Sequence, residues 1–526
     1  MGIVEQNEKE NRFWFYFFLA GLIVGLILRF YLASFAKMPG HGDSAFYYTV
    51  AKNIALGRGP VIDYIVYFFS GLLPLPHYAG DFWNPTAGYL IAIPMIIFRS
   101  TSIHVALIAP ILTGIVPAIV GYLAGKKYSG SITVGALTGV LTFFSPFQVW
   151  FSTTTEAIIF SGAFGAFALY FMMKGDESPR NYLVASIFTG LANLIRQDTI
   201  LLLGVLGICI LLATVPWKSK LIVASAAVGI HLLILSPLLI KNYMELGSLF
   251  PAGPAKTAFL TTYEDFHSYN KEIDWRTLRA TFGIRGIITK RLHTAWENIG
   301  QVEYFIDPVL EWLFLASLVE LIFIRRNFLK LKWLLPAFLF AAFEYLFYTF
   351  VASYSGPGSL IKSLGVLMPF ICLMIIDSCA AYLRPKSLLF SAVILLSVYS
   401  AYTGFRRNYA STVYYNDIYG QYKIVQSIVA EDAEKRGIEA SDISIMARDT
   451  WDVYEGTGFK TVMVPNNNVD TILFVAQHYD THYILLPADR PQLQKVYDNT
   501  TPDPRFHLIA SIPNSDLKIF WMDFGP

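Results

Sequence analysis

Long runs of apolar residues, separated by short polar loops, fill most of the chain up to residue 404. A helix needs about 20 apolar residues to cross a hydrocarbon core about 30 Å thick. Runs of this kind predict eleven membrane spans, at residues 13–35, 102–125, 131–150, 156–173, 181–196, 199–216, 220–240, 308–324, 333–352, 361–382 and 387–404. The pattern therefore predicts a polytopic α-helical membrane protein with about eleven transmembrane helices.

The apolar stretch Asn84–Phe98 is shorter than a full crossing requires, so we interpret it as a re-entrant or interfacial helix. On that interpretation, basic residues gather in the loops on one side of the membrane, the side of the N-terminus. Examples are Lys126 with Lys127, Lys218 with Lys220, and Arg325 with Arg326. Because positive loops stay inside, we expect a cytoplasmic N-terminus and an extracellular C-terminus in the cell membrane.

Three longer polar regions then fall on the outer side: residues 36–101, 241–306 and 405–526. In the last region, apolar spacing predicts helices at 417–435 and 469–479, and strands at 441–447, 459–465 and 481–487. Alternating helices and strands favour a partly parallel sheet with helices packed on it. We expect a transmembrane domain at 1–404, with outer loops 36–101 and 241–306, and a small extracytoplasmic α/β domain at 405–526.

Composition supports the membrane interpretation. Charged residues are 15% of the chain, against about 25% in an ordinary soluble protein. Hydrophobic residues are 55% and the mean hydropathy is +0.48, which argues against a soluble enzyme and against a disordered chain. The net charge of +2 gives no indication of nucleic-acid binding. The chain has no P-loop, HExxH, GxSxG or strand-linked GxGxxG motif.

Ionisable residues at the outer ends of the predicted spans are the candidates for chemistry, because charge near the membrane is costly unless it is paired or hydrated. They are Asp43, Glu156, Arg196, Asp198 and Lys362. Each has a structural alternative. Asp43 can cap the helix that begins near Ser44, and Glu156 can interact with a helix dipole. Arg196 can pair with Asp198, and Lys362 can extend to the membrane interface.

Four segments resemble motifs of GT-C glycosyltransferases, and they follow one another in the order and spacing of that superfamily. Asp43 to Tyr48, followed by Gly57-Arg58-Gly59, resembles the acidic loop with paired tyrosines that follows span one. Trp83 to Tyr89 resembles the start of the second juxtamembrane helix. The pair Ser145-Pro146 with Thr155-Glu156, and the turn from Gly190 to Asp198, resemble two later motifs. The resemblance covers roughly residues 10–245 and is greatest to the protein-mannosyltransferase and aminoarabinose-transferase branch.

The resemblance implies an inverting transfer of a sugar from a polyprenyl- or dolichyl-phosphate donor to a hydroxyl group on the outer membrane face. The acceptor would be a lipid, a glycan or a protein. Asp43 would be the catalytic base, and the donor and acceptor would be bound by Tyr47, Tyr48, Glu156, Arg196, Asp198 and Lys362. A divalent cation, if one is bound, would use Asp43 and Glu156. The superfamily usually has two acidic residues in the first motif, whereas Ser44 follows Asp43 here.

Two other classes of protein remain as alternatives: a polytopic transporter, and a non-catalytic assembly or sensor protein whose tail binds a partner. Transporters typically carry internal repeats and charges near the bilayer midplane. We find no repeat in the sequence, although Glu344 lies well inside a predicted span.

Overall fold

The computed structural model describes every residue except 1, 302–305, 355, 384, 501–502 and 525–526. The chain forms two compact units, each built from three separate stretches of sequence. The first unit comprises Met1–Phe35, His104–Met244 and Ile288–Ala410, and the second comprises Ala36–Ile103, Glu245–Ile287 and Ser411–Pro526.

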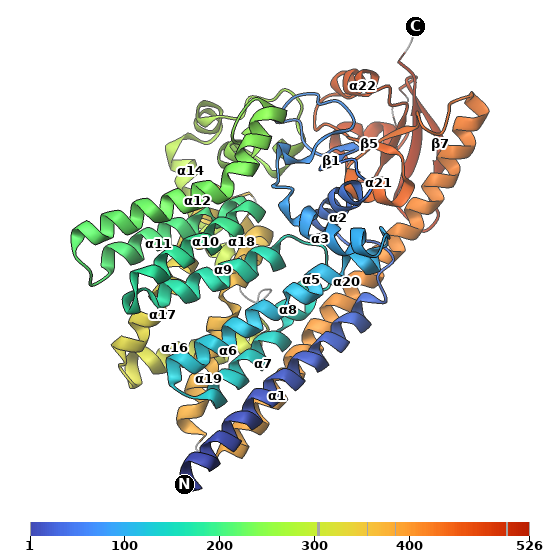
Figure 1. Cartoon of the computed structure of the whole chain (residues 1–526). Helices are drawn as coiled ribbons and strands as arrows, with labels where there is room; N and C mark the ends of the chain where they lie inside the picture. Colours follow the sequence, from blue (N-terminus) through green and yellow to red (C-terminus); the bar gives the residue numbers. More distant parts are fainter. Residues whose placement is uncertain (1, 302–305, 355, 384, 501–502, 525–526) are drawn as a thin grey trace. The chain divides into compact units, whose positions relative to one another are not determined.

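The first unit is helical (Figure 1). Its main helices are α1 (Gly2–Ala33), α4 (Ile103–Ala106), α5 (Ile108–Thr113), α6 (Ile115–Ser129), α7 (Ile132–Phe144), α8 (Pro146–Phe151), α9 (Ile158–Met173), α10 (Pro179–Ile195), α11 (Leu201–Leu212), α12 (Trp217–Leu246), α16 (Pro308–Val319), α17 (Phe328–Leu346), α18 (Gly356–Leu364) and α19 (Met368–Tyr382). Helices α14 (Trp275–Gly300) and α20 (Lys386–Arg436) each belong partly to the second unit. Single turns η2 (Gly175–Glu177), η3 (Gln197–Ile200), η6 (Glu320–Ile324), η7 (Phe347–Val351) and η8 (Gly365–Leu367) extend or join these helices.

Each predicted span corresponds to a helix or to consecutive helical segments. Among the described residues, six helices are long and apolar enough to cross a membrane: Glu10–Ala33, Ile103–Ser129, Trp217–Leu246, Phe328–Val351, Gly358–Tyr382 and Lys386–Arg436. The chain is thus a multi-pass membrane protein. The total of eleven crossings stays a prediction, because α7, α9 and α11 have only 13, 16 and 12 residues.

Small residues set the close packing of α6 against α7. A Cβ atom added to Gly135 would lie 2.7 Å from the carbonyl oxygen of Tyr122, and one added to Gly125 would lie 2.9 Å from the Cα of Gly135. Paired small residues allow this approach of backbones, which is how helices gain packing energy where lipid supplies no hydrophobic drive. Larger residues at these glycines would push the two helices apart.

The second unit contains a six-stranded sheet with the order β2-β5-β4-β6-β8-β7. Its strands are β2 (Tyr64–Ile65), β4 (Ser444–Ala447), β5 (Lys460–Met463), β6 (Tyr483–Leu486), β7 (Phe506–Ser511) and β8 (Lys518–Met522). The first four in this order are parallel, and β8 and β7 add antiparallel pairs at one edge. Helices α21 (Thr450–Thr457), α22 (Val469–His478) and α23 (Gln494–Tyr497), with the turn η9 (Pro491–Leu493), connect the strands.

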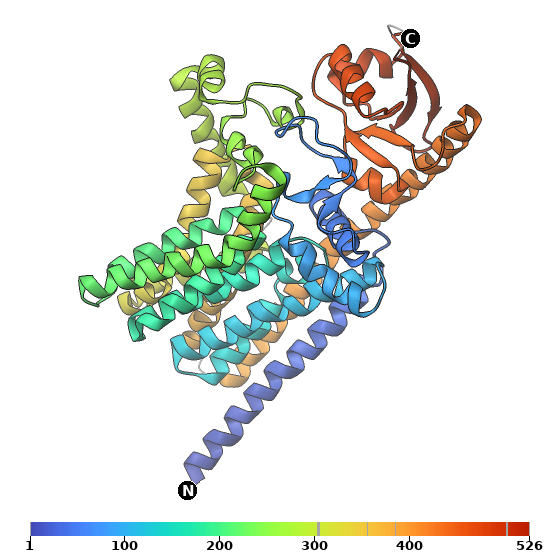
Figure 2. The same ribbon diagram turned by 45° about the horizontal axis from the view of Figure 1, so that its top comes forward.

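Alternate side chains of the central strand β4 enter two different hydrophobic clusters. Ile445 and Ala447 pack with Val425 and other residues of α20, whereas Met446 packs with Ile472 and other residues of α22. Successive strand residues point to opposite faces, so the sheet is covered by a helix on each side (Figure 2). The helices and strands expected at 417–435, 441–447, 459–465, 469–479 and 481–487 are all present in this arrangement.

The sheet also takes a strand from the first outer loop. Tyr64 and Ile65 of β2 pair in parallel with Thr461 and Val462 of β5. The unit therefore differs from the domain expected at residues 405–526 alone, because hydrogen bonding along this edge joins loop 36–103 to the tail.

The remaining elements of the second unit lie in the two loops. The first loop holds α2 (Gly42–Ala55), a two-stranded antiparallel sheet of β1 (Val61–Ile62) and β3 (His77–Tyr78), η1 (Ala79–Asp81) and α3 (Thr86–Ile97). The second holds α13 (Ala252–Lys256), η4 (Thr257–Phe259) and η5 (Tyr263–His267). At 12 residues, α3 is about 18 Å long and too short to cross a bilayer, as expected for Asn84–Phe98.

We expect the second unit to lose stability in acid through His267. Burial, and then the charges of Arg490 and Arg448, lower the pKa of His267 to about 3. In the unfolded chain this group titrates near 6.5, so between about pH 6.5 and 3 only the unfolded state takes up the proton. Above about pH 6.5 the neutral His267 does not lower the free energy of unfolding. As the pH falls below this value, the free energy of unfolding decreases by up to about 1.4 kcal/mol per pH unit.

The measurement is thermal unfolding of the full chain and of His267→Phe between pH 4 and 7. The variant should show a shallower decline of melting temperature in acid, since phenylalanine can retain the stacking on Tyr67, whose ring centre lies 5.9 Å away. The exposed His507→Phe is the control. Equal acid sensitivity of wild type and His267→Phe would contradict the assignment.

Candidate active site

Asp43 is the second residue of α2, which begins at Gly42 after the N-cap residue His41. The helix ends close to the expected position, before Gly57, whose φ of +80° suits the left-handed turn that stops a helix. Asp43 is half-buried and its carboxylate lies in the first turn, where the helix dipole favours negative charge. The helix therefore holds this carboxylate in place, and the N-cap position expected as its alternative role belongs to His41.

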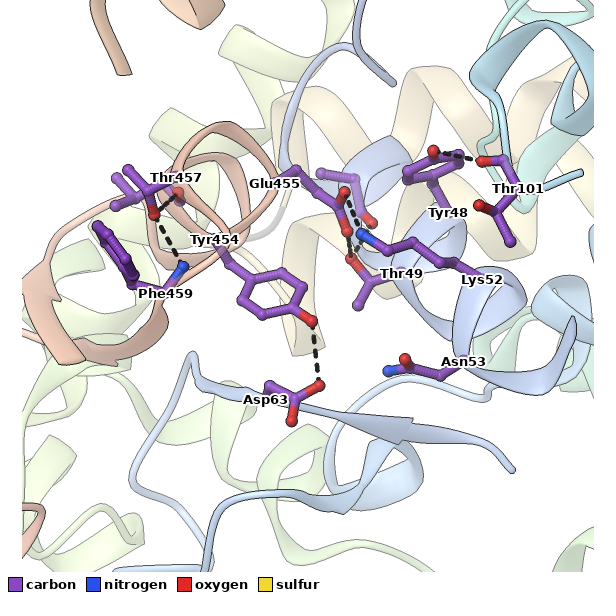
Figure 3. Close-up of polar contacts among 12 residues, drawn as sticks. Tyr48, Thr49, Lys52, Asn53, Asp63, Thr101, Tyr454, Glu455, Thr457 and Phe459 are labelled. Carbon is purple, nitrogen blue, oxygen red and sulfur yellow. Dashed lines mark hydrogen bonds and ion pairs between the residues drawn. The ribbon is translucent and has the colours of Figure 1, made fainter. Parts of the chain in front are cut away.

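The two tyrosines after Asp43 are both held within the second unit. Tyr47 is buried, and the hydroxyl of Tyr48 donates a hydrogen bond of 2.6 Å to the carbonyl oxygen of Thr101 (Figure 3). Burial, and then the charge of Glu455, raise the pKa of Tyr48. Tyr48 thus fixes α2 against the end of the first loop and stays protonated.

Arg196 and Asp198 form a bidentate ion pair in the first unit, at the turn between α10 and α11. Arg196 donates from Nε to Oδ1 of Asp198 at 3.1 Å and from a terminal nitrogen to Oδ2 at 2.7 Å. The Asp198 carboxylate also accepts hydrogen bonds from the hydroxyls of Tyr348 and Ser363. The pairing that the spacing suggested is therefore present, and it holds the guanidinium group in one orientation.

Glu344 of α17 lies near this ion pair. Its side chain is fully buried, it is within electrostatic range of Asp198 and Arg196, and neither carboxylate oxygen has a hydrogen-bond partner among the described residues. Glu344, Tyr348 and Ser363 are three polar residues near this ion pair that the sequence did not predict at the site. Ser363 follows Lys362, and that neighbouring position was the only signal for it.

Glu156 and Lys362 form a second ion pair in the first unit. The Lys362 ammonium lies 3.0 Å from a carboxylate oxygen of Glu156, and the two side chains are 15% and 1% exposed. Lys362 therefore turns inward to a buried carboxylate and does not extend to the membrane interface. Because Lys362 and Ser363 are consecutive residues of α18, this helix contacts both ion pairs.

The structure thus brings together four of the predicted site residues within the first unit: Glu156 with Lys362, and Arg196 with Asp198. Asp43, Tyr47 and Tyr48 share α2 in the second unit. Half-buried cations held in fixed orientation by carboxylates can stabilise an anionic group, whereas a half-buried carboxylate at a helix start can accept a proton. These two functions, in one membrane protein, fit transfer chemistry on a phosphate-bearing substrate.

Comparison with known proteins relates the first part of the chain to one family. Residues 83–240 match the model of the dolichyl-phosphate-mannose-protein mannosyltransferase family. No curated protein matches the chain by sequence. The matched segment contains Glu156, Arg196 and Asp198.

Solved structures of the same fold cover almost the whole chain. ArnT from Cupriavidus metallidurans, solved bound to undecaprenyl phosphate, aligns over 97% of this chain and 98% of its own, with a TM-score of 0.56 and 14% identity. AglB from Archaeoglobus fulgidus, an archaeal oligosaccharyltransferase solved with an inhibitory peptide and a dolichol-phosphate, aligns over 92% of this chain and 70% of its own, with a TM-score of 0.55 and 13% identity. The chain therefore has the fold of these solved enzymes, and its residues 83–240 are similar to the mannosyltransferase family.

Proposed function

We propose that the protein transfers a sugar from a polyprenyl-phosphate-linked donor to a hydroxyl group of a lipid, glycan or protein acceptor, with inversion at the anomeric carbon. The observation that carries the proposal is the pair of cation–carboxylate contacts that meet at α18 in the membrane unit, in each of which the cation is 15% exposed. A leaving lipid phosphate needs cations of this kind, and a soluble nucleotide is not required.

In the proposed reaction, the acceptor hydroxyl attacks the anomeric carbon from the face opposite the lipid phosphate. Its proton passes to the Asp43 carboxylate, a step that is typically worth about 10²–10⁴-fold in rate. The bond from the anomeric carbon to the phosphate oxygen breaks, and its electron pair leaves with the phosphate. Arg196 and Lys362 stabilise the charge that develops there.

Asp198 and Glu156 orient the two cations in this scheme. Asp198 is itself held by the hydroxyls of Tyr348 and Ser363, so its ion pair with Arg196 is fixed before the donor binds. Preformed cations need no reorganisation during the reaction, which is where electrostatic catalysis gains most of its effect.

A divalent cation bound by Asp43 and Glu156 stays a prediction of the sequence. Glu156 is paired with Lys362, and this ammonium group would compete with a divalent cation for the same carboxylate. The proposed reaction uses no step through a metal. Turnover that survives incubation with EDTA is the expected result.

The proposal is tested by incubating the purified full chain with a panel of polyprenyl-phosphate sugars and hydroxyl acceptors. Consumption of one donor, with release of polyprenyl phosphate and a product of inverted anomeric configuration by NMR, is expected. A retained configuration would overturn the mechanism. Absence of turnover across the panel, with transport of a solute or binding of a protein partner instead, would overturn the assignment as an enzyme.

The proposed orientation places the second unit outside the cell, and labelling of an introduced cysteine tests it. Ala440→Cys lies at an exposed position, whereas the native Cys209 and Cys372 are buried. We expect an impermeant thiol reagent to label Ala440→Cys in intact cells. A matched Lys127→Cys, in a predicted cytoplasmic loop, should label only after the cells are opened, and the reverse pattern would invert the topology.

A further inference from the structure

In the second unit, the carboxylate of Glu455 on helix α21 contacts two residues of α2 in the first loop (Figure 3). Glu455 accepts a hydrogen bond of 2.6 Å from the hydroxyl of Thr49, and its other oxygen lies 3.0 Å from the ammonium group of Lys52. The Glu455 side chain is only 6% exposed. Thr49 and Lys52 lie three residues apart on one face of α2, so a single side chain restrains two successive turns of that helix.

The residue before Glu455 restrains the segment that follows α2. The hydroxyl of Tyr454 donates to Asp63 at 3.1 Å, and Asp63 also accepts a bidentate pair of hydrogen bonds from Arg58. Arg58 in turn donates to Asn53 near the end of α2. The chain leaving α2 is thus tied to α21 and back to the helix itself.

Trp451 restrains the beginning of α2. Its indole ring packs directly on Gly42, where an added Cβ atom would lie 2.1 Å from the ring. Gly42 is the first residue of α2 and precedes Asp43, so α21 contacts the helix at its start, at its middle and just beyond its end.

From these contacts we infer that Glu455 is a positioning residue for Asp43: α21 fixes the axial position and rotation of α2, and so the place of the base. The inference rests on the proposed function of Asp43. A shift of α2 by one residue moves its side chains by about 1.5 Å along the axis. A misplacement of about 1 Å can lower a reaction rate by about 10²-fold, so a small slip of α2 would be visible in turnover.

The test is Glu455→Gln in the full chain, measured alone and together with Asp43→Asn. Glutamine can still accept a hydrogen bond from Thr49, but it removes the charge that holds Lys52. We expect kcat to fall on the order of 10-fold with the donor KM unchanged, because the proposed phosphate-binding residues lie elsewhere. In the Asp43→Asn background the same change should have almost no further effect, since residues that act as one unit are not additive.

Two further variants keep the test sharp. Glu431→Gln removes an exposed ion pair with Lys435 and should leave kcat unchanged. Thr49→Val removes the hydrogen bond to Glu455 and keeps its charge, so it serves if Glu455→Gln lowers the melting temperature markedly.

Equal losses in both backgrounds would show that Glu455 acts independently of Asp43 and would overturn the inference. So would unchanged turnover in both Glu455→Gln and Thr49→Val. Failure of the proposed base is seen separately, as near-normal turnover of the single Asp43→Asn variant.

Discussion

An Asp43→Asn variant should fold normally and transfer sugar about 10²-fold or more slowly than the wild type, because an amide cannot accept the proton of the attacking hydroxyl. Asparagine has nearly the same size as aspartate. The N-cap of α2 is His41, so no cap is lost, and the favourable charge–dipole contact that the change removes is worth about 0.3–1 kcal/mol. A large effect on rate with a small effect on stability separates the role of a base from a structural role.

The measurement is steady-state turnover at saturating donor, with the melting temperature of each variant determined in the same detergent. Asp417→Asn is a matched control, since it makes the same substitution at an exposed position of the same unit. Near-normal transfer by a well-folded Asp43→Asn protein would move the base elsewhere, with Glu156 and Asp198 as the next candidates.

The second large effect is expected at Arg196. Arg196→Lys keeps one positive charge but loses the planar fork that makes two hydrogen bonds to Asp198. We expect turnover to fall by about 10²–10³-fold, the loss typical when one preorganised donor to a developing negative charge is removed. The donor KM should rise as well, because in the proposed reaction Arg196 also contacts the donor phosphate in the ground state.

Arg180→Lys, at an exposed position of the same unit, is the control for this change. Lysine is preferable to alanine at Arg196, because removing one partner of a buried ion pair costs about 3–5 kcal/mol and would confuse activity with stability. The same consideration applies to Lys362, whose partner Glu156 is 1% exposed. Unchanged donor KM and turnover in Arg196→Lys would remove Arg196 from the phosphate site.

The membrane helices were predictable because a long apolar run has few alternatives to a helix in lipid. The ion pair of Arg196 with Asp198 could also be predicted, since the two residues lie two positions apart in one turn. The contact of Glu156 with Lys362 was not, because it joins residues that are far apart in the sequence and no local pattern encodes it. Tyr348 was not predicted for the same reason, and Glu344 stood out inside an apolar run although its neighbours could not be named.

The strand β2 shows a different limit. Two residues, Tyr64 and Ile65, are too few to produce the alternation by which strands are recognised. The strands β4, β5 and β6 could be predicted because each is buried and bounded by turn residues. The mixed origin of the sheet therefore emerges only from three-dimensional contacts.

The pairing of β2 with β5 has a consequence for biogenesis. Tyr64 leaves the ribosome early, but its partner Thr461 is synthesised about 400 residues later. The backbone groups of β2 that pair with β5 therefore stay without this partner until nearly all the membrane helices have been synthesised. Closing a connection of this length is slow, so a chain truncated before residue 460 should leave the first loop accessible to proteases even when its membrane helices are complete.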